Sequence, residues 1–277
     1  MIILFGYSFS YLQSQNFEAG VGLGFSFYQG ELNDGSFKSN LAVLEPIANG
    51  WLGYQPIPYL NIQANLFYGK LSADDAFSES TGRQQRNLSF NSIVYGGELR
   101  MELNILPFDY YNDRLLAPYV FGGVGMMHFN PKTQFRGQNV ELQPLGTEGQ
   151  GIQGFDEKYD LWTLILPGGA GLKLRLGDNF VISGEGGYAK TFTDYLDDVG
   201  SATNAPYSIV LENNGELAAD LSNKRDDFFG IEASEFDDSD FRRGTPTSDD
   251  GFIFLRMRIA SHFPSLSGAG GVDCYKF

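Results

Sequence analysis

The feature that most constrains this chain is a series of segments in which apolar side chains occupy every second position. In residues 17–28, FEAGVGLGFSFY, one face carries large apolar residues and the other carries mostly glycine and polar residues. A period of two is the pattern of a β-strand whose two faces meet different surroundings. Eight segments follow this pattern, at residues 17–28, 44–54, 60–68, 88–105, 118–129, 159–176, 180–191 and 251–263. Strands of about ten residues are long enough to cross a bilayer when tilted.

The connections between these segments alternate between long and short. The long ones are 29–43, 69–87, 130–158 and 192–250, and the short ones are 55–59, 106–117 and 177–179. Outer-membrane barrels have long outer loops and short periplasmic turns, and an even strand number leaves both termini in the periplasm. The sequence therefore predicts an all-β fold, an eight-stranded antiparallel transmembrane β-barrel over residues 16–263, placed in the outer membrane with both termini periplasmic.

The composition favours the same class and excludes others. The 277 residues include 35 glycines, 24 phenylalanines and 15 tyrosines, an enrichment typical of transmembrane barrels. Acidic residues outnumber basic ones 34 to 19, which excludes an electrostatic interface with nucleic acid. Two histidines and one cysteine argue against a zinc or iron–sulfur site, so we expect no metal centre and no cofactor.

Both ends of the chain differ from the barrel segments. Residues 1–15, MIILFGYSFSYLQSQ, are apolar and then small or polar, which predicts a secretory signal peptide although the first basic residue is Lys38. The alternative is a short hydrophobic strand or an ordered N-terminus. Residues 264–277 are too short and too rich in glycine and serine for a domain, which predicts a flexible periplasmic tail.

Eight charged residues within the predicted strands share the face opposite the bulky aliphatic residues. They are Glu98, Arg100, Glu102, Lys173, Arg175, Glu185, Arg256 and Arg258. A charge facing lipid costs a few kcal/mol, so these side chains must point into the lumen. The lumen of an eight-stranded barrel is filled by its own side chains. We therefore expect an ion network that plugs the barrel rather than a channel.

The two histidines give little reason to expect catalysis. His128 is predicted at the outer end of its strand and His262 at the periplasmic end of another, so they cannot meet. No serine is spaced to pair with His128 on one strand face, and no phosphate loop or metalloprotease motif is present. We expect a non-catalytic protein, with a barrel enzyme as the least favoured hypothesis.

The connection 192–250 carries much of the negative charge of the chain, whose net charge is −15. The interpretation we favour is a solvated outer loop. The alternative is binding of a divalent cation by clusters such as Asp197–Asp198 or Asp237–Asp240, although the spacing does not match an EF-hand.

Four short sequence motifs carry a resemblance to a known family. They are Tyr28-Gln-Gly-Glu-Leu32, Phe129-Asn-Pro-Lys-Thr133, Pro167-Gly-Gly-Ala-Gly-Leu-Lys173 and Thr191-Phe-Thr-Asp-Tyr-Leu-Asp-Asp-Val199. Together they resemble the PorG family of outer-membrane barrels, associated with the type IX protein secretion system and gliding motility. The last motif is the most specific. The resemblance implies a barrel without catalysis, attached on its periplasmic side to a ring of a PorK-like lipoprotein and a PorN-like periplasmic protein.

Three of these motifs fall at the predicted outer mouth of the barrel. We expect charged residues there to brace the mouth through ion pairs and hydrogen bonds, namely Glu31, Lys190, Asp194, Asp197 and Asp198. Pro131 lacks an N–H, so we expect it to end its strand and turn the chain over the lumen.

Two functions from different classes remain open. The first is an anchor and scaffold in the outer membrane for a periplasmic secretion ring. The second is a surface adhesion or host-contact barrel that acts through the acidic loop 192–250.

The tail generates a prediction, because Cys274 is the one cysteine of the chain and the predicted compartment is oxidising. Its neighbours Tyr275 and Phe277 would supply apolar anchors to a partner. We expect a mixed disulfide between Cys274 and a periplasmic ring component, in preference to a free thiol or a homodimer. Non-reducing electrophoresis of thiol-blocked membranes should show a larger, reducible species that Cys274→Ser removes. Monomer alone, with Cys274 freely alkylated, would contradict the covalent link.

Overall fold

A computed structural model of the chain describes residues 16–33, 35–108, 114–177, 180–200, 205–230, 243–244 and 249–263. The predicted signal peptide 1–15, the tail with Cys274, Tyr275 and Phe277, and the acidic segment Asp237–Asp240 lie outside these residues.

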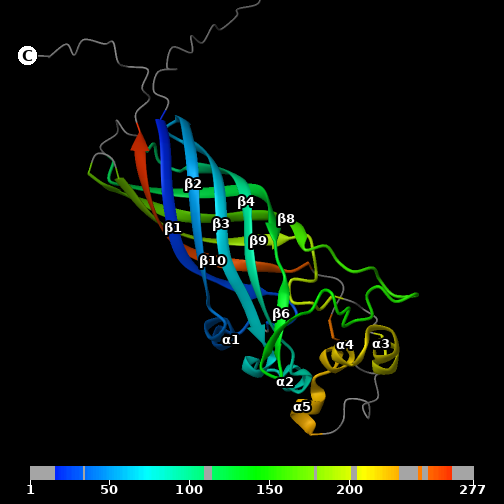
Figure 1. Cartoon of the computed structure of the whole chain (residues 1–277). Coiled ribbons are helices and arrows are strands. Elements are labelled where there is room, and N and C mark those ends of the chain that lie inside the picture. Colours follow the sequence, from blue (N-terminus) through cyan, green and yellow to red (C-terminus); the bar gives the residue numbers. More distant parts are fainter. Residues whose placement is uncertain are drawn as a thin grey trace, which may run out of the picture.

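Eight antiparallel strands close into a barrel, as the sequence predicts (Figure 1). The barrel strands are β1 (Asn16–Gln29), β2 (Glu45–Ile57), β3 (Leu60–Asp74), β4 (Ser89–Asn104), β5 (Leu116–His128), β8 (Trp162–Leu176), β9 (Phe180–Thr191) and β10 (Gly251–Phe263). Each strand pairs with its neighbour in this order, and β1 pairs with β10 along its length to complete the ring. Closure leaves no free strand edge, which is the condition for a sheet in lipid.

The longer connections gather at one end of the barrel, opposite the end where β1 begins and β10 ends (Figure 1). They contain α1 (Phe37–Ala42), η1 (Asp75–Phe77), α2 (Thr81–Arg86), α3 (Tyr207–Asn214), α4 (Glu216–Ser222), α5 (Arg225–Phe229) and the strands β6 (Pro131–Phe135) and β7 (Gln138–Glu141). We call the described parts of 30–44, 75–88, 129–161 and 192–250 the crown, and the opposite end the turn end. Among the described residues, no helix has the length and apolar character to span a membrane.

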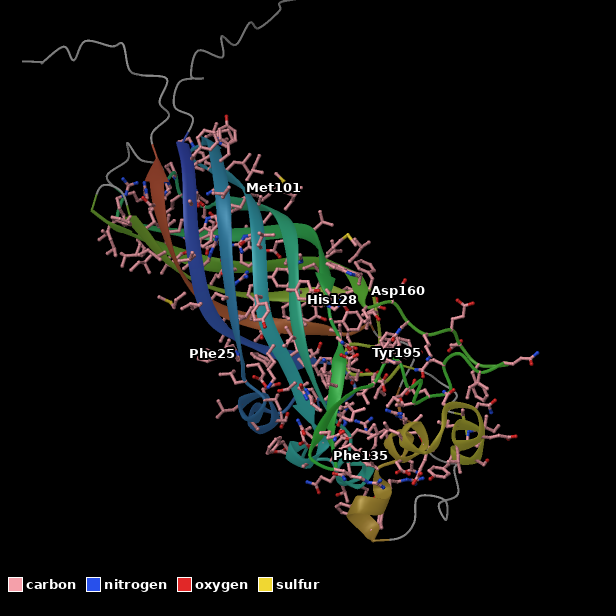
Figure 2. The ribbon with its side chains drawn as sticks, viewed as in Figure 1. Phe25, Met101, His128, Phe135, Asp160 and Tyr195 are labelled. Atoms are coloured by element: carbon pink, nitrogen blue, oxygen red, sulfur yellow. The ribbon has the colours of Figure 1, made fainter. Side chains whose placement is uncertain are left out.

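The outside of the barrel is an apolar belt. Leu23, Leu66 and Leu99, from three different strands, are exposed over 70%, 71% and 64% of their surfaces. Phe25 and Met101 likewise point away from the barrel wall (Figure 2). An exposed apolar surface of this extent indicates contact with lipid rather than water.

The lumen divides into two halves of different chemistry. Toward the crown it is filled by buried apolar side chains, which are Tyr28, Phe67, Leu71, Phe90, Val94, Phe121, Met127, Phe252 and Phe254. Toward the turn end it is filled by polar and charged side chains from seven of the strands, joined by the Tyr119 hydroxyl of β5. The inward-facing alternate positions of each strand therefore specify both layers.

One element of the crown was not expected from the sequence. The prediction that Pro131 turns the chain over the lumen is wrong, because Pro131 begins β6 and lies opposite Ser92 of β4. Strands β6 and β7 form a hairpin whose turn residues, Arg136 and Gly137, have φ values of 48° and 81°. Two positive φ values in a two-residue turn suit the right-handed twist of a hairpin.

The expectation that connection 192–250 is a solvated loop holds for exposed positions such as Glu212 and Asn213 and is wrong for other described residues. Asp197 and Asp198 are only 2% and 0% exposed. Val210 and Ala219, from α3 and α4, belong to a buried apolar cluster that also includes Ala205 and Ala218. Small apolar residues at helical spacing were hidden by the high local charge, and they pack the segment against the rest of the crown.

The arrangement predicts which cysteines an impermeant maleimide reaches in intact cells. In a Cys274→Ser background, single cysteines at four exposed crown positions should be labelled. These variants are Ala42→Cys, Ala76→Cys, Asn139→Cys and Asn213→Cys. Ile57→Cys, at the exposed end of β2 beside the β2–β3 turn, should label only after the outer membrane is permeabilised. Labelling at Ile57 alone in intact cells would show that the barrel has the opposite orientation. Labelling at all five positions would indicate that no membrane separates them.

Candidate functional site

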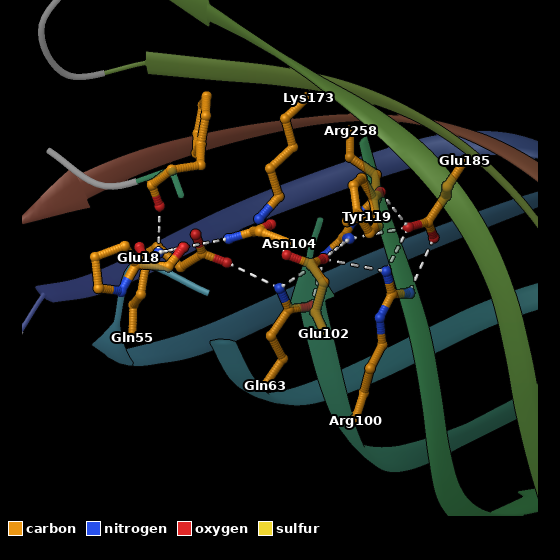
Figure 3. A network of polar contacts seen from close by, with 12 residues as sticks. Glu18, Gln55, Gln63, Arg100, Glu102, Asn104, Tyr119, Lys173, Glu185 and Arg258 are labelled. Carbon is orange, nitrogen blue, oxygen red and sulfur yellow. Dashed lines mark hydrogen bonds and ion pairs between the residues drawn. The ribbon is translucent and has the colours of Figure 1, made fainter. Parts of the chain in front are cut away.

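Glu185 of β9 has three arginine partners and lies toward one end of the network of polar contacts, with Glu18 toward the other (Figure 3). Arg100 reaches both of its oxygens, with Nη1 3.0 Å from Oε1 and Nη2 2.5 Å from Oε2. Arg256 and Arg258, two residues apart on β10, approach the same carboxylate at 2.9 and 3.0 Å. The Tyr119 hydroxyl donates to Oε2 at 2.8 Å. Three guanidinium groups therefore converge on one fully buried carboxylate.

A second carboxylate extends this network toward the turn end. Glu102 of β4 contacts Lys173 of β8 and lies 3.4 Å from Arg100 and 3.5 Å from Arg258. Gln63 connects it to a third acid, since its Nε2 lies 3.3 Å from Glu102 and 2.9 Å from Glu18. The network thus joins strands from all sides of the barrel.

Aromatic rings cover the guanidinium groups. Arg100 lies 3.6 Å from the centre of the Phe121 ring, and Arg258 lies 3.7 Å from that of Trp51. Arg256 stacks on Phe254 at 4.0 Å. A desolvated cation over an aromatic face gains about 2 kcal/mol. Phe121 and Phe254 also belong to the apolar cluster, so they form the boundary between the charged and the apolar halves of the lumen.

The turn end is closed by a residue that the strand pattern does not include. Phe108, in the β4–β5 connection, is 1% exposed and packs with Ala117 and Val181. Its backbone N–H donates to the carbonyl of Pro58 at 3.0 Å, and its carbonyl accepts from Gln55. Arg175 lies over its ring, 5.0 Å from the centre.

At the crown end, a tyrosine joins two carboxyl groups that are far apart in the sequence. The Tyr28 hydroxyl oxygen lies 2.8 Å from Asp197 Oδ2 and 2.5 Å from Asp250 Oδ1. The other oxygen of each aspartate accepts a backbone N–H, from Val199 to Asp197 at 3.0 Å and from Leu196 to Asp250 at 2.9 Å. One oxygen of Glu31 lies within 4.8 Å of both aspartates.

Asp198 points to a different set of partners. It accepts from the hydroxyls of Thr147 at 2.5 Å and Tyr159 at 2.7 Å, and Arg243 lies 3.7 Å away. Tyr159 stacks on Tyr195 with ring centres 4.6 Å apart, and Tyr195 is labelled in the crown in Figure 2. Because donors occupy the oxygens of Asp197 and Asp198, the geometry gives no support to a shared cation at this pair.

The predicted bracing residues do not all meet at the mouth. Lys190 is the clearest exception, because its exposed side chain pairs with Asp249 at 3.3 Å on the outer surface. Burial raises the pKa of Asp194 to about 8, and the charges of Glu31 and Asp249 add to the rise. The backbone carbonyl of Glu31 accepts from Arg86, which forms a two-pronged ion pair with Asp75.

Sequence reasoning missed several residues of both sites. Glu18, Gln63 and Tyr119 face the lumen on the same register that was used for the charged residues, so the alternation pointed to them. Tyr28 also lies on that face. Asp250 had no such signal, because it precedes β10 and its partner Tyr28 is 222 residues away.

The histidines lie at opposite ends of the barrel. His128 stacks on Tyr95 with ring centres 4.8 Å apart and has Trp162 at its edge, an arrangement typical of the aromatic belt at a membrane interface. His262 Nε2 lies 3.7 Å from Glu18. Neither places a base beside a serine hydroxyl in the described contacts.

Comparisons with known proteins give one family and several barrels. A family model described as "Domain of unknown function (DUF6089)" matches residues 1–218. No curated protein matches the chain. Solved structures similar to it include Ail, the attachment invasion locus protein of Yersinia pestis (TM-score 0.41, 12% identity, covering 90% of this chain and 99% of that one). They also include Neisserial surface protein A (TM-score 0.44, 9% identity, covering 89% of this chain and 97% of that one). A third is the N-terminal β-barrel domain of Pseudomonas aeruginosa OprF (TM-score 0.35, 12% identity, covering 91% of this chain and 100% of that one).

The lumen network predicts a large loss of stability when its central acid is neutralised. Glu185→Gln leaves three buried guanidinium groups short of one negative charge and should lower the free energy of unfolding by about 3–5 kcal/mol. The matched control is Glu141→Gln, which breaks an exposed pair with Lys132 and should cost about 0–1 kcal/mol. Urea unfolding in detergent micelles measures both. Equal costs for the two variants would show that the lumen is hydrated.

Proposed function

Because the chain belongs to the DUF6089 family, which has no assigned function, we propose its role from its own geometry: a non-catalytic outer-membrane barrel that anchors a periplasmic ring complex of the type IX secretion system. The observation that carries this proposal is the filled lumen. A barrel whose lumen is filled, and whose described residues place no base beside a nucleophile, contributes its two ends and its place in the membrane.

The described side chains close the barrel at three levels. Phe108 covers the turn end, the Glu185 network fills the middle, and the apolar cluster around Phe121 and Phe254 fills the crown half. An ion crossing this path would have to break buried ion pairs and displace packed aromatic rings. Transport through the lumen is therefore a poor candidate for the function, and a structural role fits better.

The positions of three of the four sequence motifs support the family resemblance on which the secretion role rests. Tyr28 and Asp197, from the first and last motifs, are hydrogen-bonded partners. Phe129, from the second, stacks on Tyr159 with ring centres 6.2 Å apart, and Tyr159 donates to Asp198 of the last motif. Three of the four segments that carry the resemblance thus form one connected structure at the crown mouth, whereas the motif 167–173 lies within β8 in the barrel wall. The turn end is left for periplasmic partners such as PorK-like and PorN-like proteins.

A second function is favoured by a specific observation, the folded crown. A loop used only as a cover needs no core of its own, yet α3 and α4 pack around Val210, Ala218 and Ala219. The crown also exposes Phe228 and Phe229, at 50% and 43%. A stable surface platform of this kind suits an adhesion or host-contact barrel.

The experiment that separates the two functions removes α3 to α5 and keeps the crown mouth. Residues 207–230 are replaced by a short glycine–serine linker, so that the motif ending at Val199 and the carboxyl group of Asp250 stay in place. The scaffold proposal predicts that type IX secretion continues at the level of the parent strain and that a C-terminal tag still captures the same periplasmic proteins from mild detergent.

Two results would contradict the scaffold role. One is capture of no periplasmic protein by the tagged full-length chain. The other is normal secretion after the whole gene is removed, together with lost surface attachment in the 207–230 variant. Heat-modifiable migration in electrophoresis is the control that the barrel has assembled in each strain.

A further inference from the structure

We propose that the crown is held on the barrel mouth by a proton-dependent latch, in which Tyr28, Asp197 and Asp250 share one proton beyond that of the tyrosine hydroxyl. Loss of this proton opens the latch and releases the described residues 192–200 and 205–230 from the mouth. This device is separate from the secretion role proposed above and does not depend on it.

The latch joins three parts of the chain. Tyr28 lies near the end of β1, Asp197 lies in the connection after β9, and Asp250 immediately precedes β10. All three are buried, at 0%, 2% and 0% exposure. Leu196 and Val199, on either side of Asp197, are fully buried in the main apolar cluster. The hydrogen bonds of Tyr28 therefore position the two apolar residues that seal the mouth.

The two hydrogen bonds at the Tyr28 oxygen need two hydrogens, and with both aspartates ionised only the hydroxyl hydrogen is present. The Tyr28 hydroxyl has one hydrogen, yet its oxygen lies within hydrogen-bonding distance of a carboxyl oxygen on each side. With both aspartates ionised, one of these contacts would bring two lone pairs together without a hydrogen. A proton on either aspartate completes a chain in which one carboxyl group donates to the tyrosine oxygen and the tyrosine donates to the other carboxylate.

The surroundings favour keeping that proton. The nearest charged groups are mostly acidic: Glu31 lies beside both aspartates, and Asp194 adds to the negative potential at Asp250. Among the described residues, the cation that acts on Asp197 is Arg86 of α2, which is engaged by Asp75 at 2.7 Å. Arg243 faces Asp198 and Glu148 instead, and Tyr188 of β9 faces Asp250.

The direction of the pH effect follows from burial. Burial raises the pKa of Asp197 well above its ordinary value, with Glu31 as the next cause, and burial followed by the charge of Asp197 does the same for Asp250. An acid whose pKa is raised by folding stabilises the folded state fully below its unfolded pKa, about 4 for aspartate. That stabilisation is lost as the pH rises through the folded value. The latch is therefore closed in acid and opens toward alkaline pH.

Limited proteolysis of the full-length chain in detergent micelles tests the latch. Trypsin cuts after Lys224 and Arg225 are followed from pH 6 to pH 9, and each rate is divided by that of an unstructured peptide with the same sites in the same tube. The wild type should show a rate that rises toward tenfold per pH unit, the slope for loss of one proton on opening.

Asp250→Asn keeps a hydrogen donor that cannot be lost and should flatten this slope at least twofold, as should Asp197→Asn. The matched control Glu212→Gln, at an exposed acid of α3, should keep the wild-type slope. Heat-modifiable migration shows that each barrel is folded. A flat profile in the wild type, an unchanged slope in both folded asparagine variants, or opening at pH 6 on addition of a chelator would each overturn the proposal. The wild-type profile and the chelator result stand even if neither variant folds.

Discussion

Lipid on the outside of a closed barrel sets the conditions for everything else in this structure. Because charge on that face is costly, the ionisable residues of eight strands are directed to one narrow lumen. There they are removed from water, so each must find a partner of opposite charge or a hydrogen bond. Glu185, contacted by Arg100, Arg256 and Arg258, is the result of this constraint. The same network fills the space that a channel would need.

Small residues make this crowding possible. Gly171 lies beside the Tyr119 ring, and a Cβ added there would come within 2.5 Å of it. Tyr119 could not then reach Glu185. Likewise, a Cβ at Gly187 would approach the ring of Phe254, which carries the guanidinium group of Arg256. The glycines are therefore needed in the barrel wall as well as in the turns, because they leave room for large side chains to pair in the lumen.

The barrel and its lumen residues could be predicted from the sequence because both follow from a period of two. Once lipid fixes one face of β4, Glu98, Arg100 and Glu102 must lie on the other, and they are buried there. The crown could not be predicted in this way. Its contacts join residues such as Thr147 and Asp198, 51 positions apart, through side chains in irregular backbone. The prediction for Lys190 fails for the opposite reason. The strand alternation places its side chain on the outer surface, where it pairs with Asp249, whereas the charge pattern of the mouth suggests a bracing role.

The lumen and the crown mouth both bury carboxyl groups, but they neutralise them in different ways. A buried carboxylate in the lumen is neutralised by guanidinium groups, which keep their charge at any pH that the protein meets. At the crown mouth, Asp197 and Asp250 have no cation at contact distance among the described ion pairs, and they are held by a tyrosine hydroxyl and two backbone N–H groups. Neutralisation there depends on a proton, which can be lost. The lumen is therefore built to stay closed whatever the surroundings, whereas the seal above it is sensitive to them. One barrel thus combines a permanent neutralisation of charge in its lumen with a reversible one at the crown mouth, because guanidinium groups hold their protons and the two aspartates share theirs.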